Sequence, residues 1–216
     1  MATLWGPRRG PKLAEPARQL VVLLHAYESS GEEFIHLAPL LQRFAPHAAF
    51  VAPNGPVPCD GPKGGFQWWP PTGGDPDKRI SGARRLHARL DGFIDEELAR
   101  HDLSEDQLAV AGFSQGAMAA LYVGLRRPRP VAGVISFSGD LIDEESLATG
   151  ASARPPVLLL HGAADPVLPV ARLHRTEATL RRYGVEPRVH VSPTLGHGVG
   201  LDGIRQAGAF LRSAFA

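Results

Sequence analysis

The stretch that decides the fold reads Leu108-Ala109-Val110-Ala111-Gly112-Phe113-Ser114-Gln115-Gly116. Its first four residues form a continuous apolar run, which predicts a strand buried on both faces of a parallel sheet. A helical pattern follows at Ala117–Arg127 and stops before Pro128, which cannot continue a helix. The G-x-S-x-G pattern therefore lies between a strand and a helix, the setting of a nucleophile elbow. We expect a strained backbone at Ser114, a conformation that typically costs about 1–3 kcal/mol.

The rest of the chain repeats this alternation of short apolar runs and helical patterns. Further strands are predicted at 19–25, 48–52, 131–137, 157–161 and 188–191, and further helices at 81–101, 170–183 and 204–215. The alternation predicts an α/β fold with a mostly parallel, doubly wound sheet and helices on both faces. With 216 residues, the chain is expected to form one domain, 1–216, without a large cap domain. Ligands of such sheets bind at the carboxyl ends of the strands.

A long segment, 53–80, is rich in proline and glycine and carries Phe66, Trp68 and Trp69. Loops of this length in compact domains are usually functional or disordered. The aromatic residues favour an ordered loop packed over the site. They could contact substrate, pack the loop, or form a patch that docks a protein.

The serine hydroxyl needs a base to take its proton, because it is a poor nucleophile at neutral pH. His197 is the candidate, since it lies in the glycine-flanked loop 194–198 between the last predicted strand and the last helix. The other eight histidines are expected in surface, strand or turn positions.

The third member should be a carboxylate that follows a strand between Ser114 and His197. Asp165 meets this condition, and Asp140 and Asp143 are rivals after the preceding strand. The chain order Ser, Asp, His is the one that α/β-hydrolases use.

The sequence lacks the motifs and charge patterns that are typical of several other classes of protein. There is no H-E-x-x-H, C-x-x-C or G-x-x-x-x-G-K-[ST] pattern, and no metal or other cofactor is expected. The net charge of +1 gives no field for nucleic acid, and short basic runs such as Arg126-Arg127 are expected to be solvated helix ends. Cys59 is the single cysteine and is interpreted as incidental. The apolar run 20–24 is too short for a signal peptide or a membrane span, which predicts a cytoplasmic protein.

With these residues in hand, the chain resembles the phospholipase/carboxylesterase family of α/β-hydrolases, which contains acyl-protein thioesterases and small bacterial carboxylesterases. The resemblance runs nearly end to end. It rests on Leu23-Leu24-His25-Ala26-Tyr27, Gly31-Glu32-Glu33-Phe34, Val51-Ala52-Pro53-Asn54, Gln67-Trp68-Trp69, Gly112-Phe113-Ser114-Gln115-Gly116, His161-Gly162, Asp165-Pro166-Val167 and Gly196-His197.

The resemblance implies a catalytic triad of Ser114, Asp165 and His197. It also implies an oxyanion hole made by the backbone N–H groups of Tyr27 and Gln115, and it implies that Trp68 lies beside the acyl or alcohol channel. One departure is Ala26, where the family normally has glycine. Alanine would shift the oxyanion loop if that position required a positive φ.

Together these features predict a serine carboxylesterase that hydrolyses small to medium acyl esters through an acyl-enzyme. One alternative is a thioesterase or lysophospholipase acting on longer acyl chains, and another is a catalytically dead binding protein on the same scaffold. The expected partner is a small-molecule ester, with the protein a monomer or homodimer.

Overall fold

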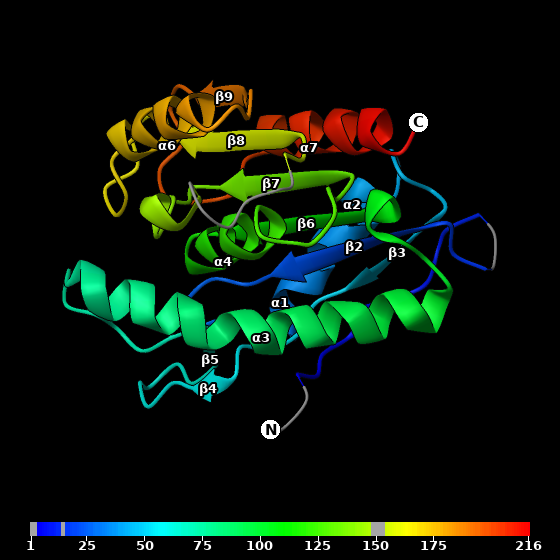
Figure 1. Ribbon diagram of the computed structural model, residues 1–216, viewed down its shortest axis with the longest axis horizontal. Coiled ribbons are helices and arrows are strands. Elements are labelled where there is room, and N and C mark those ends of the chain that lie inside the picture. The colour runs from blue at the N-terminus through cyan, green and yellow to red at the C-terminus, as the bar shows by residue number, and fades with distance from the viewer. Residues whose placement is uncertain (1–3, 14–15, 148–153) are drawn as a thin grey trace.

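A seven-stranded sheet forms the centre of the computed structural model, which describes residues 4–13, 16–147 and 154–216 (Figure 1). Neighbouring strands are parallel, except that β1 is antiparallel to β3. In spatial order the strands are β1 (Arg8–Arg9), β3 (Ala48–Val51), β2 (Gln19–Leu24), β6 (Leu108–Phe113), β7 (Gly133–Phe137), β8 (Val157–Gly162) and β9 (Arg188–Ser192). The six longer strands were all predicted from the sequence, several of them from continuous apolar runs.

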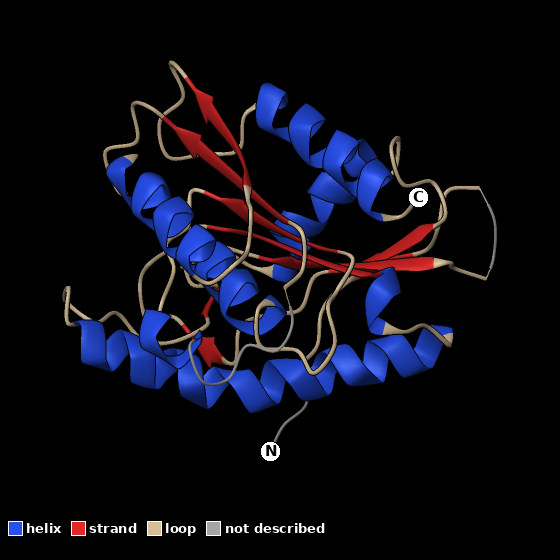
Figure 2. Ribbon diagram, turned by 45° about the horizontal axis from the view of Figure 1, so that its top comes forward, coloured by secondary structure: helices blue, strands red, loops and turns tan. Residues whose placement is uncertain are grey.

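Helices cover both faces of the sheet (Figure 2). The α-helices are α1 (Gly31–Phe34), α2 (Ala38–Leu41), α3 (Pro76–His101), α4 (Gln115–Gly124), α6 (Ala171–Arg182) and α7 (Leu201–Ala214). Short 3₁₀ turns lie at Ile35–Leu37, Glu105–Gln107 and Glu144–Ser146. The predicted doubly wound α/β architecture is confirmed. None of the helices in the described ranges has both the length and the apolar character that crossing a bilayer demands.

The alternation of side chains along β2 shows how the two cores form. Leu20, Val22 and Leu24 pack into the cluster under α3, α4 and α6. Val21 and Leu23 point to the opposite cluster, under α2 and α7. All five are fully buried, as expected for a central parallel strand covered on both faces.

The segment predicted as a loop over 53–80 is shorter than expected. Helix α3 begins at Pro76, because the Asp75 side chain accepts hydrogen bonds from the backbone N–H groups of Asp77 and Lys78. This is an N-cap followed by proline in the first turn, a favoured way to begin a helix. The remaining loop also contains a small antiparallel hairpin, β4 (Val57–Pro58) with β5 (Phe66–Gln67).

The expectation that Arg126 and Arg127 are solvated is wrong. The Arg127 side chain is only 3 % exposed and forms ion pairs with Asp91, Asp95 and Glu105. Arg126 is half-buried, with its guanidinium 3.9 Å from the Tyr122 ring centroid. Both arginines tie helix α4 to its neighbours.

Helix α4 approaches the carboxyl end of β2 very closely at Gly116. A Cβ atom added there would fall inside van der Waals contact of the carbonyl oxygens of Leu24 and His25. Those oxygens belong to backbone and cannot rotate away, so only glycine fits.

Gly116→Ala should therefore lower the free energy of unfolding, by about 1–3 kcal/mol as is typical of overpacking. The matched control is Gly92→Ala, on the exposed side of α3, where an added Cβ meets no atom within 4 Å. That change should raise stability by about 0.5–1 kcal/mol, because alanine is the better helix former. Urea unfolding of both variants measures the difference. Equal effects would contradict the close approach of α4 to β2.

Candidate active site

Ser114 occupies the turn between β6 and α4. Its backbone has φ 55° and ψ −116°, a strained conformation for a residue other than glycine. A Cβ at Gly112 would collide with the backbone of Gly116, so both glycines of the pattern allow the strand and helix to meet. The turn lifts the Ser114 side chain out at the carboxyl edge of the sheet.

His197 and Asp165 meet Ser114 at that edge. The Nδ1 of His197 lies 2.7 Å from Asp165 Oδ2, and its Nε2 lies 2.9 Å from Ser114 Oγ. When Nδ1 carries the ring proton and donates a hydrogen bond to the carboxylate, Nε2 is unprotonated and can accept the proton of the serine hydroxyl. The structure thus joins the three predicted side chains into one hydrogen-bond chain across three loops.

Asp165 is fixed on its other oxygen as well. Its Oδ1 accepts hydrogen bonds from the backbone N–H groups of Val167 and Leu168, at 2.8 and 2.9 Å. Burial alone would raise the pKa of Asp165, but the hydrogen bonds from His197, Leu168 and Val167 outweigh it and lower that pKa. The carboxylate is therefore held ionised and oriented toward the imidazole.

The rival carboxylates have other partners. Asp140 is fully buried and accepts hydrogen bonds from Arg172 and Arg175, with Arg79 at 3.4 Å. Asp143 forms a two-point contact with Arg84. Neither makes a hydrogen bond to His197 in the part of the chain that the structure describes.

The loop that carries His197 is held at both ends by a side-chain cluster not anticipated from the sequence. At its start, His190 and Ser192 on β9 each donate to Asp202 Oδ2, at 2.8 and 2.6 Å. Asp202 lies in the first turn of α7, just after the loop. The hydrogen bonds from Ser192 and His190 lower the pKa of Asp202 to about 2.

The same loop also rests on the end of β8. The carbonyl oxygen of Leu195 accepts a hydrogen bond from the backbone N–H of Ala164 at 3.0 Å. A Cβ at Gly162 would collide with that carbonyl, so the glycine gives the loop room to settle on the strand.

The predicted oxyanion donors lie in the loop after β2 and at the first residue of α4. The backbone N–H groups of Tyr27 and Gln115 have no hydrogen-bond partner within the described residues. Ala26 does not have a positive φ, so alanine there adds no strain; the left-handed residue of this loop is Glu28, with φ 57°.

The His25 ring holds the loop that carries Tyr27 in place through hydrogen bonds. Burial lowers the pKa of His25 to about 4, so its ring stays neutral at pH 7. Its Nδ1 donates to the Ala26 carbonyl at 2.7 Å, and its Nε2 accepts from the Gly55 N–H at 2.9 Å. The Trp68 indole N–H donates to the His25 carbonyl at 2.8 Å.

Trp68, which was predicted to lie beside the substrate channel, does not line the cavity, and its neighbour Trp69 does. Trp68 is 2 % exposed and packs behind the oxyanion loop, whereas Trp69 lines the cavity over Ser114. The Gln115 side chain holds both residues, since its amide oxygen accepts a hydrogen bond from the Trp68 backbone N–H and its amide NH₂ donates to the Trp69 carbonyl. The structure therefore offers Trp69 rather than Trp68 as the residue at the channel, and the burial of both rings argues against a docking patch.

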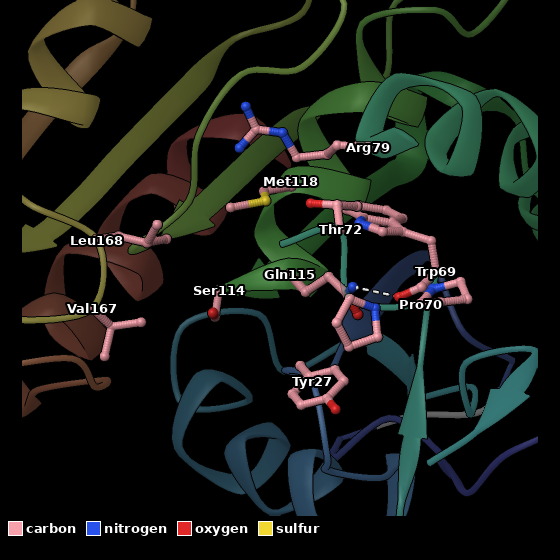
Figure 3. Close-up of a pocket in the computed structure, with 11 residues that line it drawn as sticks. Tyr27, Trp69, Pro70, Thr72, Arg79, Ser114, Gln115, Met118, Val167 and Leu168 are labelled. Carbon is pink, nitrogen blue, oxygen red and sulfur yellow. Dashed lines mark hydrogen bonds between the residues drawn. The ribbon is translucent and has the colours of Figure 1, made fainter. Parts of the chain in front are cut away.

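The cavity over Ser114 has a volume of about 240 Å³ (Figure 3). Its walls come from the loop after β2, the loop between β5 and α3 that carries Trp69, the first turns of α3 and α4, and the loop after β8. It is lined by Tyr27, Trp69, Pro70, Pro71, Thr72, Arg79, Ser114, Gln115, Met118, Val167 and Leu168. Over the described ranges, no three His, Cys, Asp or Glu side chains are grouped so as to hold a metal ion.

Comparison with known proteins places this chain in a family. The phospholipase/carboxylesterase family model matches residues 12–214. Esterase YpfH of Escherichia coli K12 is 30 % identical over 86 % of this chain and 78 % of its own. Acyl-protein thioesterase 1 of Schizosaccharomyces pombe is 30 % identical over 74 % of this chain and 73 % of its own. The crystal structure of esterase PE8 superposes with a TM-score of 0.93, at 38 % identity, over 99 % of this chain and 100 % of its own.

An α/β fold with a serine at the elbow defines a serine hydrolase. This chain belongs to the phospholipase/carboxylesterase family.

The Asp202 cluster makes stability depend on pH in a defined direction. Because the folded-state pKa of Asp202 is about 2, below its ordinary value of 3.8, its carboxylate stabilises the fold above about pH 4. That contribution is lost as the pH falls toward 2. Asp202→Asn should therefore lower the free energy of unfolding at pH 7, and the difference from wild type should shrink as the pH falls below about 4.

Urea unfolding at several pH values measures this difference. The control is Asp60→Asn, which changes an exposed carboxylate outside the cluster and should show no comparable pH-dependent loss. A deficit for Asp202→Asn that stays constant down to about pH 2 would contradict the assignment.

Proposed function

We propose that this protein is a carboxylesterase that hydrolyses small to medium acyl esters, with Ser114 as nucleophile, His197 as base and Asp165 as orienting acid. The observation that carries the proposal is the continuous hydrogen-bond chain from Ser114 Oγ through the His197 imidazole to Asp165, beginning at a strained elbow. In this geometry, one group can accept the hydroxyl proton while the next stabilises the resulting imidazolium.

In the first half of the reaction, His197 Nε2 takes the proton of Ser114 as its Oγ attacks the carbonyl carbon. The negative charge that develops on the carbonyl oxygen is stabilised by the N–H groups of Tyr27 and Gln115. One such donor is typically worth a factor of about 10²–10³ in rate. The imidazolium then gives its proton to the departing alkoxide, which leaves as the alcohol.

In the second half, a water molecule attacks the acyl-enzyme. His197 Nε2 accepts a proton from the water, and the same oxyanion donors hold the new tetrahedral charge. The bond from the carbonyl carbon to Ser114 Oγ breaks, Oγ recovers its proton from the imidazolium, and the acid is released. Asp165 keeps the imidazole in one tautomer throughout.

The size of the cavity supports small to medium acyl groups. At about 240 Å³ it lies below the range of about 300–1,000 Å³ usual for ligand pockets, and its walls are mostly apolar. The segments 138–156 and 163–170, which connect β7 to β8 and β8 to α6, are too short to add a cap domain.

Ser114→Ala should reduce kcat for a short aryl ester by a factor of about 10⁶, as when the serine of a hydrolytic triad is removed. The variant should also fail to react with a fluorophosphonate probe, which labels only an activated serine. The matched control is Ser138→Ala, at the end of the neighbouring strand β7. Ser138 also has a positive φ, and its buried hydroxyl has no hydrogen-bond partner within the described residues.

Wild type and Ser138→Ala should both hydrolyse the ester and bind the probe. An active Ser114→Ala variant would refute the nucleophile assignment. A wild-type protein that is neither labelled nor active would instead support a catalytically dead binding protein on this scaffold.

A thioesterase acting on longer acyl chains is the second candidate, because several relatives are named acyl-protein thioesterases. Two apolar side chains at the mouth could receive a longer chain: Tyr27 is 39 % exposed and Val167 is 61 % exposed.

A matched series of acetate, butyrate, octanoate and laurate, each as an aryl ester and as a thioester, separates the two activities. A carboxylesterase with this cavity should show its highest kcat/KM on acetate or butyrate esters, because longer chains would extend beyond the cavity. Highest kcat/KM on octanoyl or lauroyl thioesters would favour the thioesterase.

A further inference from the structure

One charged side chain, Arg79, lines the cavity over Ser114 and has no role in the proposed reaction. The close-up in Figure 3 shows the Arg79 side chain extending over Met118, on the other side of the cavity from Tyr27. Among the described residues that line the cavity, Arg79 is the only one with a charged side chain. Its side chain is 23 % exposed, so the charge is partly withdrawn from bulk water.

The guanidinium of Arg79 has hydrogen-bonding capacity to spare. Its Nη1 lies 3.4 Å from Asp140 Oδ2, a long contact, and no other hydrogen bond of its side chain is found in the described part of the chain. A guanidinium carries five N–H donors in a planar fork. Most of these donors are therefore available to a group in the cavity.

Asp140 is already neutralised by two other arginines. Arg172 donates to it at 2.8 Å, and Arg175 donates at 3.2 and 3.3 Å. Both contacts are shorter than that of Arg79, so the carboxylate is shared among three cations. Neither Arg172 nor Arg175 lines the cavity.

In the ion-pair group around Asp140, arginines outnumber carboxylates. Glu144, which shares Arg175 with Asp140, lies 3.7 Å from Arg175 and 3.8 Å from Arg182. Four guanidinium groups thus share two carboxylates. An anion that enters the cavity beside Arg79 would meet unbalanced positive charge in a partly dry setting, where electrostatic attraction is stronger than in water.

We propose that Arg79 selects esters that carry a carboxylate several bonds from the scissile carbonyl, such as half-esters of aliphatic dicarboxylic acids. The inference rests on the proposed esterase function of Ser114. A carboxylate suits the site because the guanidinium fork can pair with both of its oxygens. The contact lies away from the reacting atoms, so it contributes to binding equally in the ground state and the transition state. It therefore lowers KM and leaves kcat nearly unchanged.

The test compares the aryl half-ester of adipate with the aryl ester of adipic acid monoamide, which has the same length and no charge. A second pair places the carboxylate on the leaving group, with 4-acetoxybenzoate compared with 4-acetoxybenzamide. Wild type should prefer the anionic member of at least one pair, through KM. A preference in the first pair assigns the carboxylate to the acyl side, and one in the second pair assigns it to the alcohol side.

Arg79→Met should reduce the anionic-to-neutral ratio of kcat/KM by about 10- to 100-fold, the usual range for a lost charge-assisted hydrogen bond. Arg79→Lys, which keeps the charge without the fork, should retain part of the preference. The matched control is Arg175→Met, which also removes an arginine from Asp140 but does not line the cavity. It should leave the ratio close to that of wild type.

Fluorophosphonate labelling and thermal unfolding of each variant check that the serine site and the fold are intact. The inference fails if wild type shows no anionic preference in either pair, or if Arg175→Met lowers the ratio as much as Arg79→Met does. In both cases hydrolysis of the neutral esters would still support the proposed function. Loss of neutral-ester hydrolysis in wild type would instead overturn the proposed function itself.

Discussion

The close contact between helix α4 and the carboxyl end of β2 is the constraint on which the site depends. Because Gly116 touches backbone carbonyls, the chain must turn from β6 into the helix within a single residue, and Ser114 takes up the strain. Such strain costs about 1–3 kcal/mol and persists only where the surrounding packing enforces it. The nine residues of α4 from Gly116 to Gly124 are all buried, which supplies that packing.

Loops are usually the mobile parts of a fold, but the loop that carries His197 is held by hydrogen bonds at its ends and in its middle. Asp202 joins its two ends through His190 and Ser192, and the Leu195 carbonyl bonds to the loop after β8. Asp165 is held in turn by two backbone N–H groups. The hydrogen-bond chain to Ser114 therefore exists before any substrate arrives. Preorganised dipoles of this kind cost no reorganisation at the moment of reaction.

The sequence predicted those features that each leave a local pattern. Buried parallel strands appear as apolar runs, and the elbow as glycines at fixed spacing, whereas β1 has only two residues and no periodicity. The early start of α3 was signalled by Asp75-Pro76, but the surrounding proline and glycine concealed it. The burial of Arg127 depends on carboxylates 22 to 36 positions away, which no local pattern reveals. The sequence indicated the wrong tryptophan at the cavity, Trp68 in place of Trp69, for the same reason: the hydrogen bond that holds Trp68 to His25 spans 43 positions.

The alanine at position 26 shows why a local departure can leave the loop geometry intact. The turn places its left-handed residue at Glu28, so the position that lacks glycine does not need it. What shapes the loop is His25, whose ring bridges the Ala26 carbonyl and the Gly55 N–H. This bridge requires a neutral ring, because a protonated Nε2 could not accept a hydrogen bond, and burial keeps the ring neutral by lowering its pKa to about 4. Trp68 closes the arrangement from behind. The direction of the Tyr27 N–H is therefore set by a buried imidazole and an indole rather than by the backbone freedom of a glycine.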